Sequence, residues 1–370
     1  MIELLNKFIL HASLIKGIGP KTIETLTNKY SDIKINFYNL SINEFIQKGL
    51  SRQKAELLFH ELKNYDLLYT ELALLKTHEA SFLTPYNTEY PEQLKNQETY
   101  PSVLYQQKNI SININTFISL AVVSSRETNA YGKRVIYKLF EELANQNIII
   151  ISGGAIGGDT YIHEAALANN LKTVSILGSG LGYWYPRNNT HLFKKIITNG
   201  GIIMSHFPIN TPANKLTFPI RNSVIAGMAQ ATLIIQAGLK SGTLITANYA
   251  LEYGKEVGAI PGYIDDIIMI ESNNLIKQGA HCITCGNDIL SMLNIDIIQK
   301  KEFLKNKNNI YPECTAQQKK ILEICEQAKS IEEINELLNI SIDNLYNELF
   351  LLMENNYILQ DILGNWKSIS

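Results

Sequence analysis

The sequence predicts an α/β protein whose central domain is a parallel sheet covered by helices on both faces. Short apolar runs recur from about residue 116 to residue 262, at 117–123, 148–151, 173–177, 201–205, 231–237 and 257–262. Helix-period stretches separate them, as in residues 135–143, whose apolar side chains fall on one helical face. Continuous apolar strands alternating with amphipathic helices are typical of a sheet buried on both faces. The predicted core, residues 111–295, is therefore Rossmann-like.

Length and composition set the limits of this prediction. A chain of 370 residues favours two or three domains, and 45% hydrophobic residues exclude a disordered protein. The formal net charge of −2 excludes a uniformly basic surface. Any contact with nucleic acid must therefore come from a local cluster of arginine and lysine.

The cysteines and the N-terminus indicate where the protein works. Cys282 and Cys285 form a C-x-x-C pair, whereas Cys314 and Cys325 stand apart, which is not typical of a disulfide framework. Zinc needs four well-spaced ligands, and His281 beside the pair does not complete a set, so we expect no metal and no cofactor, with zinc as the alternative. We see no signal-peptide pattern and no apolar run of about 18 residues. We expect a reduced cytoplasmic protein without membrane contact.

Residues 1–65 have a helical pattern that contains a helix-hairpin-helix/SAM-like signature. Gly17-Ile18-Gly19-Pro20 makes a tight turn, and Pro20 suits the first position of the following helix. Residues 49–59 look like a degenerate second copy. Such a hairpin binds the DNA backbone without reading sequence, and the alternative is a purely structural pair of helices.

The remaining segments complete the domain order. Residues 66–110, with several prolines, read as an extended connector packed on the core, and the charged residues 296–312 read as a linker. Residues 313–370 suit a small winged-helix-like domain in which Ser330 and Glu333 form a capping box. Its would-be recognition helix has no lysine or arginine, so phosphates would be repelled and a packing or protein-contact role is favoured.

Five loops follow predicted strands of the core and should meet at one edge of the sheet, because the carboxyl ends of parallel strands lie together. They supply small residues that let backbone amides approach an anion, cations for phosphates, and rings on which bases can stack. The small residues are Gly153, Gly154, Gly178, Gly180, Ser241, Gly242 and Thr243; the cations are Arg126, Arg187, Lys215 and Arg221; the rings are Phe218, Tyr183 and Trp184. The set predicts a site for phosphate and nucleobase together. The alternative is that the glycines only make turns and that Phe218 belongs to the core.

The loop after the second strand resembles a phosphate-binding P-loop with its key cation inverted. Gly153-x-x-x-x-Gly158 is followed by Asp159, where a P-loop has lysine, so ATP hydrolysis by that route is not expected. We expect Asp159 to cap the first free amides of its helix, with a hydrogen bond from His163 one turn later. The alternative is an acid–base pair, but no nucleophile accompanies it. We predict a binding protein with no catalytic residue.

Four segments together resemble one known family. They are SGGAIGGDTYIHEAAL (152–167), LGSGLGYWYPRNN (177–189), the long run 218–262 and NNLIKQGA (273–280). They look like the DNA-processing protein A (DprA/Smf) family, and the flanking helical and winged-helix-like modules fit it as well. The resemblance implies a cytoplasmic single-stranded DNA-binding homodimer without catalytic turnover. It also implies that the protein protects incoming DNA and helps load RecA recombinase during natural transformation.

The resemblance also assigns residues. Arg126 matches the family's arginine after the first strand, and Arg187 matches a basic residue after its Tyr-Pro. Lys215 and Phe218 reproduce a Lys-x-x-Phe pair, followed by Arg221 and Asn222 for the family's Arg-Asn. The chain departs at four positions: Ser124 replaces glycine, His206 and Gln236 replace glutamate, and Ser223 replaces an arginine.

Two other functions stay open at this stage. A nucleotide phosphoribohydrolase of similar outline uses G-G-x-G-T-x-x-E, but Thr246 stands where that glutamate would be. A scaffold for recombination proteins is the other, in which DNA affinity is incidental.

Overall fold

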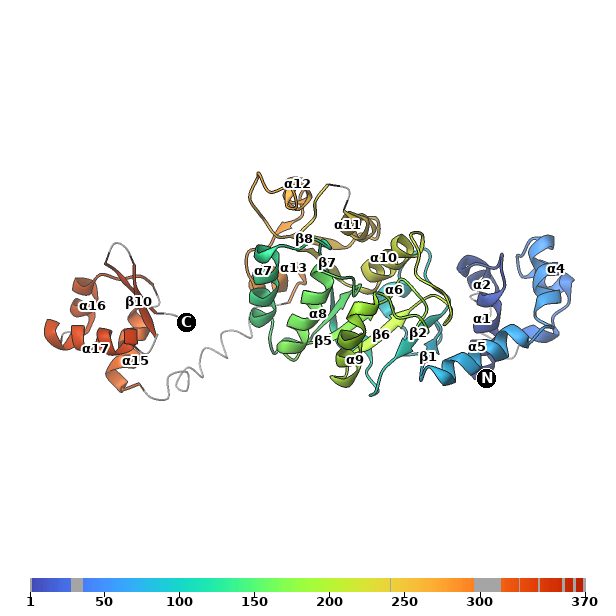
Figure 1. Cartoon of the computed structure of the whole chain (residues 1–370), viewed down its shortest axis with the longest axis horizontal. Coiled ribbons are helices and arrows are strands. Elements are labelled where there is room, and N and C mark those ends of the chain that lie inside the picture. Colours follow the sequence, from blue (N-terminus) through green and yellow to red (C-terminus); the bar gives the residue numbers. More distant parts are fainter. Residues whose placement is uncertain are drawn as a thin grey trace. The chain divides into compact units, whose positions relative to one another are not determined.

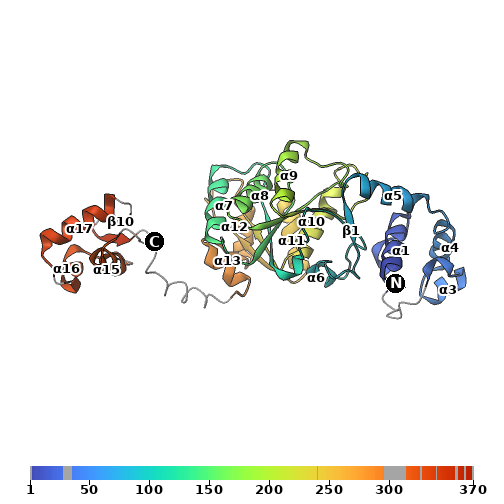
Figure 2. The same cartoon turned by 90° about the horizontal axis from the view of Figure 1, so that it is seen from below.

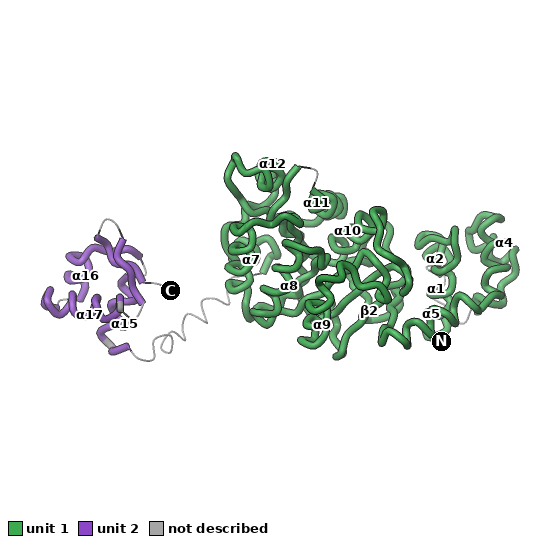
Figure 3. Tube along the Cα trace, viewed as in Figure 1, with its two compact units in different colours: residues 1–296 green, residues 297–370 purple. Residues whose placement is uncertain are grey.

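The computed structural model describes residues 2–27, 36–239, 241–295, 314–325, 327–338, 340–354, 357–361 and 364–368. The chain divides into two compact units, residues 1–296 and 297–370 (Figure 3). The predicted linker 296–312 lies outside the described residues.

A nine-stranded sheet forms the core of the first unit (Figure 1). Its strand order is β1-β2-β6-β5-β4-β3-β7-β8-β9. The strands from β3 onward run parallel to their neighbours in this series: β3 (Ile118–Val123), β4 (Ile148–Ser152), β5 (Lys172–Ile176), β6 (Ile202–Ser205), β7 (Ala231–Ile234), β8 (Glu256–Ala259) and β9 (His281–Cys282). Every residue of β4 is buried, which explains its unbroken run of isoleucines. The predicted parallel sheet is confirmed.

Helices cover both faces of this sheet (Figures 1 and 2). On one face α7 (Ala130–Glu142), α8 (Gly158–Ala168) and α13 (Gly286–Met292) pack against alternate strand residues such as Leu120 and Ile150. On the other, α10 (Thr217–Met228), α11 (Gly242–Glu252) and α12 (Ile270–Lys277) pack with the intervening residues, such as Ala121 and Ile151. Successive strand side chains point to opposite faces, so each strand serves both cores.

Residues 66–110 are not an extended connector. They form helix α5 (Asp66–Thr77), strand β1 (Ser81–Leu83), the short helix α6 (Glu92–Lys95) and strand β2 (Leu104–Gln107). β1 pairs with β2, and β2 adds antiparallel to β6, so this segment completes one edge of the sheet. Strands of three and four residues are too short to show the alternation of apolar and polar residues that identifies a strand, so the sequence of this segment suggested a connector.

The N-terminal helices and one edge of the sheet domain share a hydrophobic cluster, which includes Phe8, Leu26, Tyr105 and Phe193. The N-terminal elements are α1 (Ile2–Leu14), α2 (Pro20–Thr27), the 3-10 turn η1 (Phe37–Asn39), α3 (Ile42–Gln47) and α4 (Arg52–Glu61). Gly17 has φ +97°, and Pro20 opens α2, as expected for the predicted turn. From α5, the buried Glu71 accepts a hydrogen bond from the Ile209 amide (2.8 Å), in the loop that follows β6.

The described residues of the second unit form three helices followed by a two-stranded hairpin. The helices are α15 (Ala316–Ile324), α16 (Ile331–Leu338) and α17 (Ile342–Glu354), and β10 (Ile358–Gln360) pairs antiparallel with β11 (Trp366–Ser368). Ser330 and Glu333 bond to each other's backbone amides, so the predicted capping box is present. Ile334, Leu345, Leu349 and Trp366 are among the side chains that fill its core.

All four cysteines are free thiols. Within the described ranges, no three His, Cys, Asp or Glu side chains converge as metal ligands would. None of the described helices has both the length and the apolar character that a membrane span requires.

Candidate nucleic-acid interface

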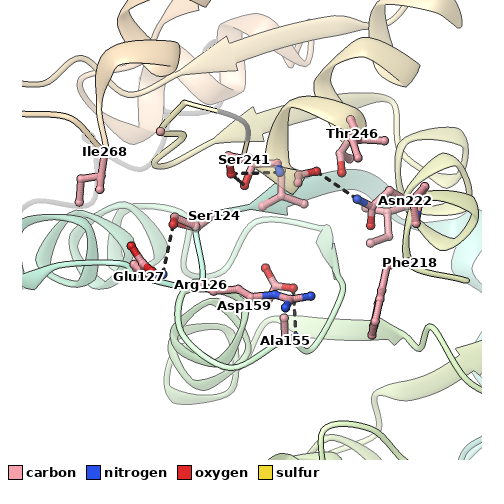
Figure 4. A pocket seen from close by; sticks show the side chains of 18 of the residues that line it. Ser124, Arg126, Glu127, Ala155, Asp159, Phe218, Asn222, Ser241, Thr246 and Ile268 are labelled. Carbon is pink, nitrogen blue, oxygen red and sulfur yellow. Dashed lines mark hydrogen bonds between the residues drawn. The ribbon is translucent and has the colours of Figure 1, made fainter. Parts of the chain in front are cut away.

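A cavity of about 710 Å³, here called the main hollow, opens beyond the carboxyl ends of β3, β4 and β7 (Figure 4). In the sheet β3 lies between β4 and β7, so the chain leaves β3 toward one side first and returns to its other side later. This reversal separates the loops that follow the strands and opens a crevice, which is the usual ligand position in open α/β sheets. The hollow is therefore a consequence of the strand order.

Three of the four predicted cations line the main hollow. Arg126 follows β3, while Lys215 and Arg221 come from the segment that leads into and forms α10. Arg126 and Lys215 are exposed, and among the described residues neither has an ion pair, so both are available to an anion. Two carboxylates, Glu127 and Asp159, also line the cavity. Glu127 was missed from the sequence, although it stands beside Arg126.

Phe218 lies between positive charges. The Arg126 guanidinium carbon is 5.4 Å from the centre of the Phe218 ring, and that of Arg221 is 5.9 Å from it. Both are within the range of a cation–π contact. Phe218 is only half-buried, so it is not simply a core residue, and it lines the main hollow.

Gly178 supports this ring from the sheet side. A Cβ atom at residue 178 would lie 2.8 Å from Cδ1 and 3.0 Å from Cε1 of Phe218. Gly178 does not line the hollow itself. Its missing side chain is what leaves room for the Phe218 ring.

Arg221 is a buried structural cation. One of its terminal nitrogens, Nη1, donates to the carbonyl oxygens of Gly153 and Ile176, each at 2.5 Å, and Nε donates to Asn222 Oδ1 (3.0 Å). Burial lowers its pKa to about 10, against an opposing effect of Asp159. The prediction treated Arg221 as a free phosphate ligand. The structure shows that much of its donor capacity ties the ends of β4 and β5 to α10.

Asp159 does not cap its own helix as expected. Its carboxylate Oδ2 accepts from the Ala155 amide (3.1 Å) in the preceding turn, and the first residue of the helix is capped by no side chain (Figure 4). Burial raises the pKa of Asp159, and the Arg221 charge opposes that rise. The carboxylate therefore holds the glycine turn closed.

His163 turns away from Asp159. Its Nδ1 lies 2.8 Å from the Thr173 hydroxyl, inside the core. Complete burial, with the Arg221 charge as a smaller cause, lowers the pKa of His163 to about 3. The expected Asp159–His163 hydrogen bond is not found, and the geometry gives no support to an acid–base pair.

The N-terminus of α11 forms the opposite wall of the main hollow. The Ser241 hydroxyl caps the helix by accepting from the Thr243 amide (3.2 Å). Asn222 donates to the Gly242 carbonyl (3.1 Å), which fixes this wall to α10. No atom would lie within 4 Å of a Cβ at Gly242, so the cavity comes directly up to the backbone there. The main hollow therefore brings together four residues of the predicted site, Asn222, Ser241, Gly242 and Thr243.

Gly153, Gly154 and Gly180 serve packing more than ligand approach. A Cβ at Gly153 would lie 2.6 Å from Arg221 Nη1, and one at Gly154, whose φ is +72°, would lie 2.5 Å from Ser175 Oγ. The Gly180 amide donates to the Thr211 carbonyl (2.8 Å). None of the three lines the main hollow. Glycine patterns do not distinguish a close packing contact from a close ligand contact.

Arg187 lies apart from the main hollow. It lines a separate cavity of about 440 Å³ with residues of the loops that follow β5 and β6. Trp184, one of the predicted stacking rings, is held by contacts within the protein. Its Nε1 donates to Gln107 Oε1 (2.8 Å), and its ring packs edge-on against Phe193 at 5.7 Å.

Two departures from the family pattern fit their surroundings: Ser124 lines the main hollow, and Gln236 lies in the core outside it. The Ser124 hydroxyl pairs with Thr128 Oγ1 at 2.9 Å, and its Cβ lies where a side chain at Gly158 would fall. Gln236 is fully buried after β7, and its amide exchanges hydrogen bonds with the Asn129 side chain (2.9 Å) and backbone (3.2 Å). A neutral amide suits this exchange because it both donates and accepts.

The other two departures lie outside the main hollow. His206 and Ser223 line a cavity of about 270 Å³ that also contacts Ile18 and Pro20 of the N-terminal helices. Burial, with a smaller effect of Arg221, lowers the pKa of His206 to about 3, so the ring is neutral. Neither substitution changes the charge that lines the main hollow.

The fold and this hollow define a Rossmann-like α/β protein with an open cavity at the switch point of its sheet. The family model of DNA recombination-mediator protein A matches residues 81–294. The chain belongs to this family, and the resemblance inferred from its motifs is confirmed.

Individual relatives agree with this assignment. Protein Smf of Escherichia coli (strain K12) is 38% identical over 216 residues, which cover 58% of this chain and 57% of that protein. DNA processing protein DprA of Streptococcus pneumoniae (strain ATCC BAA-255 / R6) is 36% identical over 202 residues, or 55% of this chain and 70% of that protein.

Two solved structures are also similar. DNA processing protein A from Streptococcus pneumoniae aligns with a TM-score of 0.64 at 28% identity, covering 78% of this chain and 96% of that chain. DNA processing protein A from Helicobacter pylori, a protein with a unique single-stranded DNA binding mode, aligns with a TM-score of 0.52 at 27% identity. That alignment covers 59% of this chain and 97% of that one.

Proposed function

We propose that this protein binds single-stranded DNA in the main hollow, as a non-catalytic component of DNA processing. The observation that carries the proposal is the half-buried Phe218 ring, held beside Arg126 in an open cavity that Lys215 and the start of α11 also line. Bases stack on such a ring whatever their identity, because every base has a π-face. The similarity to the Helicobacter pylori protein, which binds single-stranded DNA, supports the same ligand.

The chemistry divides between two kinds of contact. Arg126 and Lys215 neutralise phosphates, and the backbone at Gly242 lets a phosphate approach the positive end of α11. Phe218 holds a base. Arg221 maintains the shape of the hollow and adds positive charge below it. The expected binding is tolerant of sequence and weakened by salt.

The wider role follows the family resemblance. We propose that the protein acts in the cytoplasm during natural transformation, protecting incoming single strands and helping to load RecA recombinase. We also propose a homodimer formed through the sheet domain, and its exposed apolar residues Tyr263 (76%) and Ile264 (94%) support such an interface. The N-terminal helices would be a helix-hairpin-helix/SAM-like module and the second unit a winged-helix-like module.

The test is a titration of fluorescent oligothymidine with wild-type protein and with Arg126→Ala and Lys215→Ala. Each variant should weaken binding, and the slope of log affinity against log salt should fall by about 0.7 for each phosphate that is no longer neutralised. Lys76→Ala removes the same charge from an exposed position on α5 and is the matched control. If both hollow variants match wild-type protein in affinity and slope, the site is assigned wrongly.

The hydrolase alternative has a specific weakness in this hollow. Thr246 lines the cavity at the position where a phosphoribohydrolase would carry its glutamate, and a hydroxyl cannot stabilise developing positive charge as a carboxylate does. We expect no free base to be released from nucleoside monophosphates, and base release that Thr246→Val abolishes would favour the enzyme.

A further inference from the structure

A second hollow of about 440 Å³ lies on the same edge of the sheet, beside the loops that follow β5 and β6. Its lining residues are Gly182, Tyr183, Trp184, Tyr185, Arg187, Thr190, Pro212 and Ala213. They include an arginine and no carboxylate, in contrast to the main hollow with Glu127 and Asp159. A phosphate would therefore meet positive charge here without an opposing acid in the wall.

A small cavity of about 70 Å³ adjoins both hollows through shared lining residues. This cavity shares Arg126, Phe218 and Arg221 with the main hollow, and it shares Tyr185 with the second hollow. The loops involved follow β3, β4 and β5, which are neighbours in the sheet. The three cavities therefore succeed one another along the carboxyl edge of the strands.

Two tyrosine rings are presented to solvent along this path. Tyr183 is 49% exposed and Tyr185 is 48% exposed. Trp184 between them is anchored to Gln107 by its indole nitrogen, whereas the two tyrosine rings are about half exposed. The Tyr185 ring centre lies 5.8 Å from that of Phe218, tilted by 50°. A strand leaving Phe218 would meet Tyr185 as the next ring.

We infer that single-stranded DNA occupies both hollows, passing from Phe218 across Tyr185 to a second phosphate site at Arg187. This inference rests on the proposed function, since it requires that the main hollow binds DNA. Tyr185 supplies a stacking surface between the two sites, and Arg187 supplies the charge of the second. Short oligonucleotides fill the main hollow alone, whereas longer ones also engage Tyr185 and Arg187.

The test measures affinity for oligothymidines of increasing length, from about 4 to about 16 nucleotides, a range typical of single-strand binding sites. Tyr185→Ala should lower affinity for the longest oligonucleotide about tenfold, as expected when one base has no ring to stack on, and leave the shortest unchanged. Tyr185→Phe keeps the ring and should retain wild-type affinity. Arg187→Ala should reduce the salt slope by about 0.7, with the long oligonucleotide only. Lys76→Ala, which removes an exposed charge from α5, is again the control.

The outcomes separate this inference from the proposed function. If Tyr185→Ala and Arg187→Ala bind every length like wild-type protein while Arg126→Ala binds weakly, the second hollow is empty and the main site stands. If Tyr185→Ala weakens short and long oligonucleotides equally, Tyr185 belongs to the main hollow and the extended path is refuted. If Arg126→Ala is also without effect, the proposed function fails with it.

Discussion

Replacing Gly178 by alanine should weaken DNA binding, although Gly178 itself does not line the main hollow. The added methyl group would lie 2.8 Å from Phe218 Cδ1 and 3.0 Å from Cε1. Ordinary carbon contacts begin at about 3.5 Å, so the ring has to retreat from residue 178 by roughly 0.7 Å. The φ of Gly178 is not positive, so alanine adds no backbone strain there.

The expected magnitude follows from where the ring moves. Overpacking in a closed core costs about 1–3 kcal/mol, and we expect the lower end because Phe218 is only half-buried. The displaced ring should stack less well on its base, at a cost of about 1 kcal/mol, which corresponds to roughly a fivefold weaker affinity for oligothymidine. Binding should therefore suffer while the protein stays folded.

The assay combines the same titration with urea unfolding of each variant. Phe218→Leu removes the clashing ring atoms, so adding Gly178→Ala to Phe218→Leu should change affinity and stability very little. The single variant Phe218→Leu is the reference for this comparison, because it already lacks the ring atoms that the new methyl group would contact. The reasoning is refuted if Gly178→Ala binds like wild-type protein, or if it weakens binding equally with and without Phe218.

Two further predictions concern buried charge. Arg221→Met removes the donor to the Gly153 and Ile176 carbonyls and the cation beside Asp159. The free energy of unfolding measured in urea should therefore fall by about 3–5 kcal/mol. A decrease below about 1 kcal/mol, together with a reduced salt slope of DNA binding, would instead make Arg221 a phosphate ligand. Burial lowers the pKa of His163 from 6.5 to about 3 in the folded protein, so the unfolded state binds more protons between these two pH values. The free energy of unfolding should therefore decrease as the pH falls through that range, by up to about 1.4 kcal/mol per pH unit. His163→Asn should flatten this part of the curve, and an unchanged slope in His163→Asn would contradict the assignment.

The sequence located the site because parallel strands have a fixed direction. Arg126, Lys215, Phe218 and the Ser241–Thr243 turn follow different strands, yet parallel pairing carries their loops to one edge. The hydrophobic period was sufficient for that prediction. It contains no information on which carbonyl oxygen a loop cation will meet, so the burial of Arg221 was not foreseen.

Three other features of the structure could not be predicted from the hydrophobic period either. Gly180 looks like Gly242 in sequence, but the first is packed against the carbonyls of Pro208 and Ile209 and the second faces open space. Tyr185 was not predicted as a site residue, because the bends around Trp184 have no period from which the direction of its ring could be read. β1 and β2 depend on long-range pairing, which local periodicity does not contain.

Glu71 has a consequence for dividing this protein into fragments. The family match begins at residue 81, after α5 has ended, whereas the Glu71 carboxylate on α5 holds the Ile209 backbone in the segment that leads to Lys215. An expression fragment trimmed to that boundary would strip a buried acceptor from the Ile209 amide. The smallest autonomous version of the binding domain should begin upstream of α5.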